Sequence, residues 1–128
     1  MIKNILIIDD SPIARKILRS CLPGDRSFEI LEAGDGKAGV QRFQEAVPDL
    51  TFTDLTMPVM DGLQALQLMK EARKDAVIVV CSADIQPKTI ERVMELGAYA
   101  MLKKPPSKDI VSDLISKVEA LLGNPVIP

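Results

Sequence analysis

Residues 5–12, Ile-Leu-Ile-Ile-Asp-Asp-Ser-Pro, are the stretch of sequence that decides the fold. Four consecutive apolar residues, three of them β-branched, predict a strand that is buried on both faces, as the strands of a parallel sheet are. Asp9 and Asp10 end this strand, and Ser11 with Pro12 then forms a good N-cap and first turn of a helix. A strand passing directly into a helix is the first half of a βαβ unit.

Strands and helices continue to alternate along the chain. Residues 77–80 predict a second buried strand, and segments of mixed character predict three more, at 28–32, 50–53 and 99–102. Helical periodicity occupies the intervening segments, at 13–21, 36–46, 62–74, 87–96 and 107–122, and Gly123 is expected to end the last helix. Alternation implies right-handed crossovers. We therefore expect an α/β fold with a flavodoxin-like five-stranded parallel sheet of order 2-1-3-4-5 and five helices on two faces.

The first helix has two faces of different character. Its apolar face is expected to carry Ile13, Ile17, Leu18 and Cys21 toward the core, and Arg15 with Lys16 and Arg19 is expected on the opposite face. Cys21 and Cys81 have no CxxC spacing and lie in apolar stretches, so both are expected to be free buried thiols.

Composition restricts the number of domains and the classes of function. With 128 residues, 47% of them hydrophobic, the chain fits one domain, which we assign to residues 1–122, followed by a short tail at 123–128. Sixteen basic and eighteen acidic residues, without a long run of either sign, argue against direct binding of nucleic acid or membrane. Without a signal peptide or a membrane-spanning segment, the protein is expected in the cytoplasm. The chain has no histidine, so oxygen nucleophiles must carry any phosphoryl chemistry.

Polar side chains follow the predicted strands at the point where each one ends. Asp9 and Asp10 follow the first strand, Asp54 the third, Ser82 the fourth and Lys104 the last. Open α/β sheets bind their ligands at this edge, so three carboxylates, a hydroxyl and an ammonium group are expected at one rim. An Asp-Asp pair alone is often only a polar turn or a helix cap, and the convergence of several strand ends is what favours a site.

The three carboxylates predict a metal ion. They repel one another unless a cation lies between them, and a set of oxygen ligands without histidine or thiolate favours Mg²⁺. Asp10 and Asp54 are the expected direct ligands together with the backbone carbonyl of Thr56, and Asp9 is expected to act through water.

Asp54 is also the best candidate for a carboxylate that accepts a phosphoryl group, because it lies between the other groups. Lys104 would neutralise the phosphoryl oxygens, and the Ser82 hydroxyl would donate a hydrogen bond to one of them. Thr56 and Asp84 lie two residues after the acceptor and the hydroxyl and are expected to face solvent. A secondary hypothesis is that they screen the water that hydrolyses the phosphoryl group.

Five short motifs follow one another along nearly the whole chain, at positions 8–11, 54–62, 82–83, 97–98 and 104–105: Ile-Asp-Asp-Ser, Asp-Leu-Thr-Met-Pro-Val-Met-Asp-Gly, Ser-Ala, Gly-Ala and Lys-Pro. Together they resemble the landmarks of bacterial response-regulator receivers, and the absence of an output domain is closest to the single-domain chemotaxis type. The resemblance implies that Asp54 accepts phosphate from a sensor histidine kinase, that Mg²⁺ lies on Asp9, Asp10 and Asp54, and that Ser82 and Lys104 contact the phosphoryl group.

The resemblance further implies a stand-alone signalling switch of a two-component phosphorelay rather than an enzyme. Its downstream protein target is expected on the face formed by the fourth helix, the fifth strand and the fifth helix.

Met101 departs from the pattern of that family. Members usually carry Tyr or Phe three residues before the lysine, and this aromatic side chain turns inward when the Ser or Thr shifts toward the phosphate. Tyr99 is two residues too early to take its place. Methionine is flexible enough to enter the same cavity, so the sequence is compatible with a switch formed by Ser82 and Met101.

Two alternatives stand beside the phosphorylation switch. Met101 also motivates a binding module that keeps the fold without switching. The second alternative is a Mg²⁺-dependent phosphatase with an aspartyl nucleophile, but such enzymes place the nucleophile and the acid two positions apart as DxD, whereas Asp9 and Asp10 are adjacent.

Overall fold

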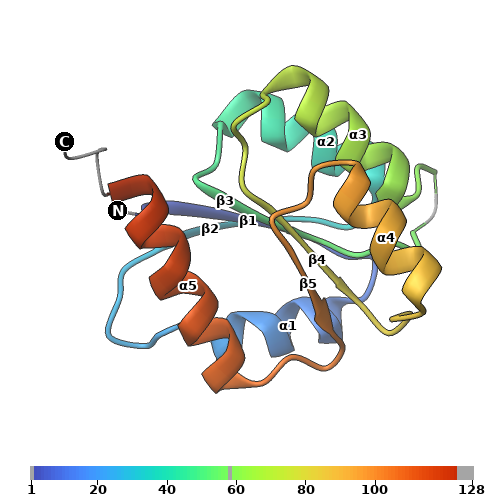
Figure 1. Cartoon of the computed structure of the whole chain (residues 1–128). Helices are drawn as coiled ribbons and strands as arrows, with labels where there is room; N and C mark the ends of the chain where they lie inside the picture. The colour runs from blue at the N-terminus through green and yellow to red at the C-terminus, as the bar shows by residue number, and fades with distance from the viewer. Residues whose placement is uncertain (1, 58, 124–128) are drawn as a thin grey trace, which may run out of the picture.

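The computed structural model describes residues 2–57 and 59–123, and its elements alternate between strands and helices along the chain (Figure 1). The strands are β1 (Asn4–Ile8), β2 (Glu29–Ala33), β3 (Leu50–Thr53), β4 (Ile78–Ser82) and β5 (Ala100–Lys103). The helices are α1 (Pro12–Cys21), α2 (Gly36–Ala46), α3 (Gly62–Ala72), α4 (Pro87–Glu95) and α5 (Lys108–Gly123). All neighbouring strands are parallel and their order is β2-β1-β3-β4-β5, which confirms the predicted sheet.

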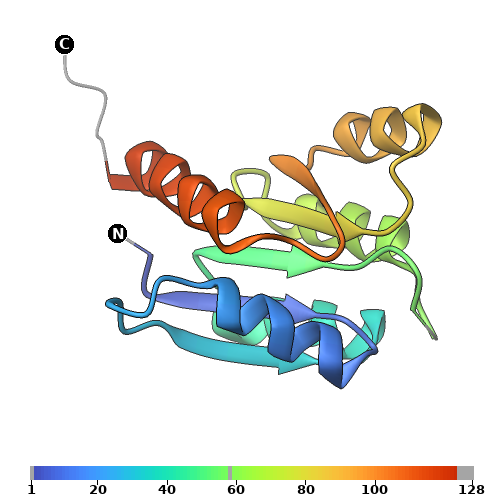
Figure 2. The ribbon, with the colours of Figure 1, turned by 90° about the horizontal axis from the view of Figure 1, so that it is seen from below.

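The helices cover the sheet in two layers, with α1 and α5 on one face and α2, α3 and α4 on the other (Figures 1 and 2). The first strand shows why: alternate residues of β1 point to opposite faces, and all four residues from Ile5 to Ile8 are at most 1% exposed. The core beneath α1 and α5 includes Ile5, Ile7, Leu18, Phe52 and Val118. The core beneath α2, α3 and α4 includes Leu6, Ile8, Phe43, Leu66 and Val93.

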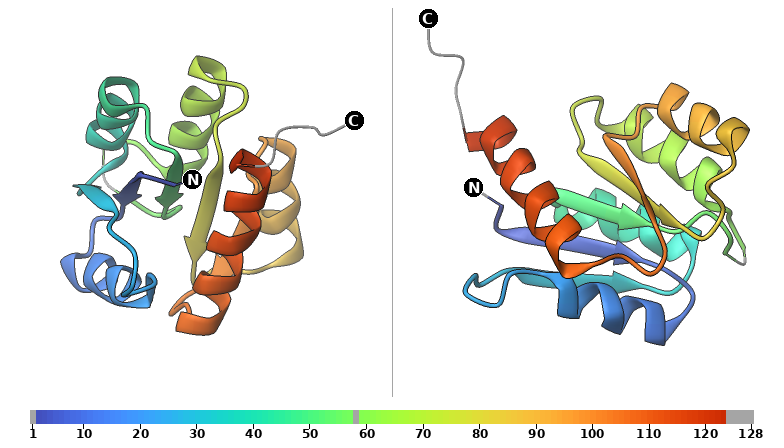
Figure 3. Two further views of the ribbon diagram at one scale, coloured as in Figure 1. Left: turned by 90° about the vertical axis from the view of Figure 1, so that its left-hand side faces the viewer. Right: turned by 60° about the horizontal axis from the view of Figure 1, so that its bottom comes forward.

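The predicted edge strands, β2 and β5, are the edges of the sheet and are less buried than the central strands. β2 and β5 are only partly buried, whereas every residue of β3 and β4 is buried. Figure 3 shows β1 lying between β2 and β3, so the first strand of the chain occupies the interior of the sheet. The carboxyl ends of these parallel strands therefore meet at one edge of the sheet.

Four helices begin at this edge with a side-chain cap. Ser11, Asp35, Asp61 and Ser107 each accept a hydrogen bond from the backbone N–H three residues later, at 3.1, 2.7, 2.9 and 3.2 Å respectively. Such caps satisfy N–H groups that have no partner within the helix. The loops after β1, β2 and β3 are thereby held in place next to the strand ends.

Element boundaries differ from the predicted ones by at most two residues, and the expected burial of one face of α1 was wrong. α5 includes Gly123, which was expected to end it, because glycine can also adopt helical angles at small cost. Residues 124–128, the expected tail, lie outside the described residues. Ile13 and Ile17 were expected in the core but are 71% and 40% exposed, since this face of α1 borders an open cavity beside Pro105.

Both cysteines are free and buried, as predicted. Among the described residues, no helix combines the length and the apolar character needed to cross a bilayer.

Candidate functional site

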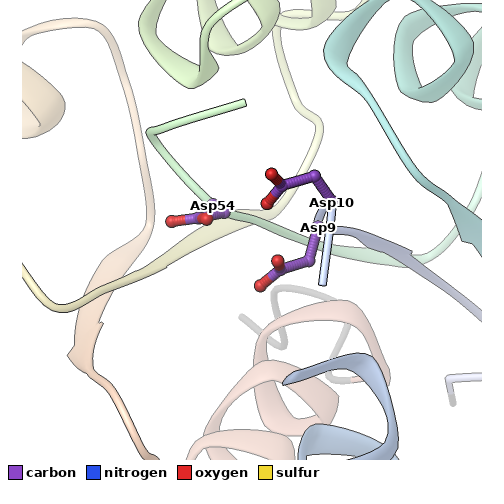
Figure 4. Close-up of side chains that lie close together, drawn as sticks. All are labelled: Asp9, Asp10 and Asp54. Atoms are coloured by element: carbon purple, nitrogen blue, oxygen red, sulfur yellow. The ribbon is translucent and has the colours of Figure 1, made fainter. Parts of the chain in front are cut away.

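Three aspartates lie together at the carboxyl edge of the sheet (Figure 4). Asp9 and Asp10 directly follow β1, and Asp54 directly follows β3. Each offers a carboxylate oxygen, and these oxygens all lie within 4.8 Å of one another. Asp9 and Asp54 are buried, while Asp10 is exposed. The structure thus brings together the three carboxylates that the sequence places at strand ends.

Strand register explains why Asp9 and Asp54 emerge side by side. β1 and β3 pair with Ile8 opposite Thr53, so the residue after each strand enters the same crevice. The Asp54 N–H donates to the Ile8 carbonyl at 2.9 Å, and the Asp9 N–H donates to the Ala33 carbonyl of β2 at 3.0 Å. The backbone of both aspartates is therefore held by the neighbouring strand.

Lys104, which directly follows the edge strand β5, completes the cluster. Its Nζ lies 2.6 Å from Asp9 Oδ2 and 3.1 Å from Asp54 Oδ2, and its backbone N–H donates to the Ser82 carbonyl at 2.9 Å. Burial by itself lowers the pKa of Lys104, but the hydrogen bonds and charges of Asp9 and Asp54 outweigh it, so the net direction is upward. The ammonium group is held charged between two carboxylates. The peptide bond from Lys104 to Pro105 is cis.

Ser82 lies at the buried end of β4, where its hydroxyl contacts the following loop. Its Oγ accepts a hydrogen bond from the Asp84 N–H at 3.0 Å, which leaves the hydroxyl hydrogen to be donated elsewhere. The carboxylate of Asp84 accepts from Gln86 N–H at 3.1 Å and from Thr89 Oγ at 3.0 Å. Ser82 is therefore linked through Asp84 to the first turn of α4.

The remaining predicted residues lie on different elements. The side chain of Thr56 is exposed in the loop after β3, and Asp84 is exposed as well, as expected for both. Met101 is half-buried on β5, opposite Val80 of β4, and packs against the core beneath α2, α3 and α4. Tyr99 precedes β5 and is 37% exposed, so it does not occupy the position of Met101. The roles of these residues stay predictions.

The segment after Asp54 holds the carboxylate from behind. The Leu55 N–H donates to Asp54 Oδ1 at 2.7 Å. The Gly62 N–H then donates to the Leu55 carbonyl at 2.7 Å, which closes the loop between β3 and α3. The Asp54 carboxylate therefore has one partner from the adjacent residue, the Leu55 N–H on Oδ1, and a second, Lys104, on Oδ2.

One residue that contacts the cluster was assigned to the exposed face of α1 by periodicity. Arg15 donates through Nη1 to the backbone carbonyl of Asp9 at 2.6 Å, and its side chain is only 20% exposed. The period of a helix places a side chain on one side of the helix axis, but a long arginine can bend back to an adjacent loop. No signal in the local pattern distinguishes Arg15 from Lys16 or Arg19.

A cavity of about 270 Å³ opens beside the cluster, between α1 and the residues that follow β5. Its wall is apolar where α1 faces Pro105 and polar where it reaches Asp54 and Lys104. Cys81 also lines it, and burial raises the pKa of this thiol to about 11. The thiol is therefore protonated at neutral pH and is not a nucleophile for the site.

The donor groups of the cluster fit a small, hard divalent cation. The groups that converge are carboxylates, with oxygen as the ligand atom, and oxygen is the ligand that Mg²⁺ prefers in proteins. One ammonium group stands against three carboxylates, so additional positive charge would stabilise the arrangement.

Comparisons with known proteins identify the family. The sequence model described as "Response regulator receiver domain" matches residues 5–116. The chemotaxis protein CheY of Halobacterium salinarum is 36% identical over 119 residues, which cover 92% of this chain and 98% of the relative. CheY of Bacillus subtilis is 34% identical over 117 residues, covering 91% and 98%. A chain of the solved CheX-CheY-BeF3-Mg complex from Borrelia burgdorferi is 26% identical, with a TM-score of 0.83 over 94% of this chain and 89% of that chain.

Proposed function

The chain belongs to the response-regulator receiver family, and from this premise we propose that it is a phosphorylation switch in which Asp54 accepts a phosphoryl group from a histidine kinase. The observation that carries the proposal is the position of Asp54, whose carboxylate lies within 4.8 Å of those of Asp9 and Asp10 and 3.1 Å from the ammonium nitrogen of Lys104. The carboxylate and the incoming phosphoryl group are both anionic, so the transfer needs positive charge beside them. The ammonium group of Lys104 supplies such a charge.

Asp10, Asp54 and the backbone carbonyl of Thr56 would hold Mg²⁺, and Asp9 would act through water. When bound, the ion would neutralise the carboxylates and the phosphoryl oxygens, which otherwise repel each other. A relative supports this assignment, because the solved complex from Borrelia burgdorferi carries Mg and BeF3 in its name.

The transfer itself requires little from the chain beyond orientation. A carboxylate oxygen of Asp54 forms a bond to phosphorus while the bond from phosphorus to the donor's histidine nitrogen breaks, and the imidazole leaves. The Leu55 N–H at 2.7 Å from Oδ1 limits rotation of the carboxylate, so the attacking group is already oriented. Lys104 lies 3.1 Å from Oδ2 of the same carboxylate, and after the transfer its ammonium group would contact a phosphoryl oxygen instead.

The read-out would begin at Ser82. Its hydroxyl hydrogen would be donated to the new phosphoryl group, and the shift would disturb the hydrogen bond that Asp84 N–H donates to Ser82 Oγ. Because Asp84 is also bonded to Thr89 on α4, the start of that helix would respond. Met101 packs against the same core as Val93 of α4 and would take the role that an aromatic residue has in most relatives.

The output would be a change of protein partner on the face formed by α4, β5 and α5. Several apolar side chains are exposed on these elements and just before β5 without a use in the core: Ile90, Met94, Tyr99 and Ile110. The protein would act in the cytoplasm, where the free thiols Cys21 and Cys81 stay reduced and the sensor kinase presents its phosphohistidine. It would act as a signalling switch, with autodephosphorylation as its only further chemistry.

Phosphorylation by a small-molecule donor tests this function directly. The wild-type chain, incubated with Mg²⁺ and a phosphoramidate or acyl phosphate, is expected to gain a phosphate that is acid-labile and sensitive to hydroxylamine. Asp54→Asn is the matched control, since it keeps size and shape while removing the nucleophile. Equal labelling of wild type and Asp54→Asn, or no labelling of either, would refute the proposal.

Amide spectra with and without beryllofluoride distinguish a switch from a module that binds partners without switching. The switch predicts shifts that extend from Asp54 to α4 and β5. Shifts confined to the phosphorylation site would favour the constitutive module.

A further inference from the structure

Arg15 connects the acidic cluster to the edge strand β2, and the proposed function gives this residue no role. Its Nη1 donates to the backbone carbonyl of Asp9 at 2.6 Å, while its Nε donates to Glu32 Oε1 at 2.8 Å. Glu32 lies on the edge strand β2, so one guanidinium joins α1, β2 and the end of β1. Only 20% of the Arg15 side chain is exposed, so these hydrogen bonds are largely shielded from water.

The carbonyl that Arg15 contacts has a particular place in the cluster. It belongs to the peptide group that joins Asp9 to Asp10, and two of the three converging carboxylates depart from the ends of this group. A peptide group is planar, so fixing its oxygen also fixes the directions in which the two residues continue.

The other polar atoms of Asp9 have partners of their own. Its N–H donates to the Ala33 carbonyl, its Oδ1 accepts from the Ser11 N–H at 2.9 Å, and its Oδ2 accepts from Lys104. The contact from Arg15 to the carbonyl completes this set and is the one that acts on the shared peptide group.

We propose that Arg15 is a positioning residue for the divalent cation, holding the Asp9–Asp10 peptide so that both carboxylates are set before the ion arrives. The inference rests on the proposed function, since it assumes that these carboxylates hold Mg²⁺. Arginine suits this task because its planar guanidinium donates in two fixed directions, to Glu32 on one side and to the carbonyl on the other. Partners of metal ligands outside the coordination sphere contribute about 10–100-fold to metal affinity when they orient a ligand.

Arg19 provides a matched control within the same helix. It lies one turn further along α1 and bonds the same carboxylate, with Nη1 at 2.6 Å from Glu32 Oε2. Its hydrogen bond goes to Glu32 and not to the acidic cluster, and half of its side chain is exposed. Removing Arg15 or Arg19 takes one positive charge from α1, but only the loss of Arg15 frees the Asp9 carbonyl.

The experiment is a Mg²⁺ titration of the metal-free full chain, followed by amide NMR, with no phosphodonor present. Arg15→Gln is expected to weaken Mg²⁺ binding by about tenfold. Arg15→Lys keeps the charge without the two-directional donor and should remain weakened, whereas Arg19→Gln should stay within about twofold of wild type because a solvated charge is screened. Thermal unfolding in EDTA reports whether each variant is folded.

Glu32→Gln is a second route to the same test if Arg15→Gln does not fold. It leaves the guanidinium in place but loosens its outer anchor, so a smaller loss of Mg²⁺ affinity in the same direction is expected. The inference is overturned if both Arg15→Gln and Glu32→Gln bind Mg²⁺ as wild type does, if Arg19→Gln loses as much as Arg15→Gln, or if Arg15→Lys restores binding fully. A wild-type chain that binds no Mg²⁺ contradicts the proposed metal site itself, so the two failures are distinguishable.

Discussion

Gly62→Ala is expected to slow phosphorylation by displacing the backbone of Asp54. Gly62 is the first residue of α3, and its N–H is bonded to the Leu55 carbonyl. A Cβ atom at this position would lie 2.0 Å from the Asp54 carbonyl oxygen and 2.5 Å from Leu55 Cα. Both are backbone atoms, so no rotation of a side chain can relieve the contact.

The size of the effect follows from these distances. Cβ atoms essentially never approach a heavy atom more closely than 3.0 Å, so either the Asp54 segment or the start of α3 must shift by about 1 Å. A displacement of about 1 Å at a reacting group can cost about 100-fold in rate, because the reaction depends on orientation. The accompanying overpacking costs about 1–3 kcal/mol of folding free energy, which leaves a domain of typical stability folded.

The assay compares initial rates of phosphorylation at limiting concentrations of a small phosphodonor with Mg²⁺ present. Gly24→Ala is the control, since a Cβ atom there would meet nothing within 4 Å, and it should react at the wild-type rate. Circular dichroism and thermal unfolding show that both variants are folded. A folded Gly62→Ala chain that is phosphorylated as fast as wild type would refute the idea that the start of α3 fixes the position of Asp54.

Three further predictions concern stability. Gly39→Ala should destabilise the fold because the new Cβ would lie 2.6 Å from Ile8 Cδ1, although alanine is favoured over glycine in helices by about 1 kcal/mol. In an Ile8→Ala background the same change should stabilise the fold. Equal effects in both backgrounds, measured by thermal unfolding, would contradict this. Burial raises the pKa of Cys81 from 9.0 to about 11, so above pH 9 the unfolded chain loses a proton that the folded chain keeps. The unfolding free energy should therefore fall by up to about 1.4 kcal/mol per pH unit between these values. Denaturant titrations at several pH values should show a smaller fall for Cys81→Ala, and an equal fall in wild type and Cys81→Ala would contradict this prediction. Mg²⁺ at ten times its Kd should raise the unfolding free energy by about 1.4 kcal/mol, and EDTA should reverse this increase. The increase should be smaller for Asp10→Asn. An Asp10→Asn chain that Mg²⁺ stabilises as much as wild type would exclude Asp10 as a ligand.

Much of the candidate site could be predicted because its residues stand at strand ends. A buried strand is visible in a short apolar run such as 77–80, and the residue after a parallel strand must lie at the edge where ligands bind. For this reason Asp9, Asp10, Asp54 and Lys104 could be grouped before their contacts were known. The predicted order of the strands rested on the apolar runs of the first and fourth strands and on the more polar or mixed character of the second and fifth, and β2 and β5 are the least buried strands in the structure.

The contacts of α1 could not be predicted in the same way. Periodicity assigned Ile13 and Ile17 to the core, but this face of α1 borders the cavity beside Pro105 and is partly open. The same periodicity assigned Arg15 to solvent, because an amphipathic pattern records only the side of the helix and not the length or bend of a side chain.

By itself the sequence determined the order of strands and helices and the chemical groups available at each strand end. These properties depend on a few neighbouring residues, on hydrophobic periodicity and on the residue that follows each apolar run. Only the tertiary structure decided which groups touch: Asp9 and Lys104 are 95 positions apart and meet at 2.6 Å, Arg15 reaches the Asp9 carbonyl, and Gly62 leaves no room beside Asp54. Such contacts depend on the register and packing of distant segments, and no local pattern encodes them.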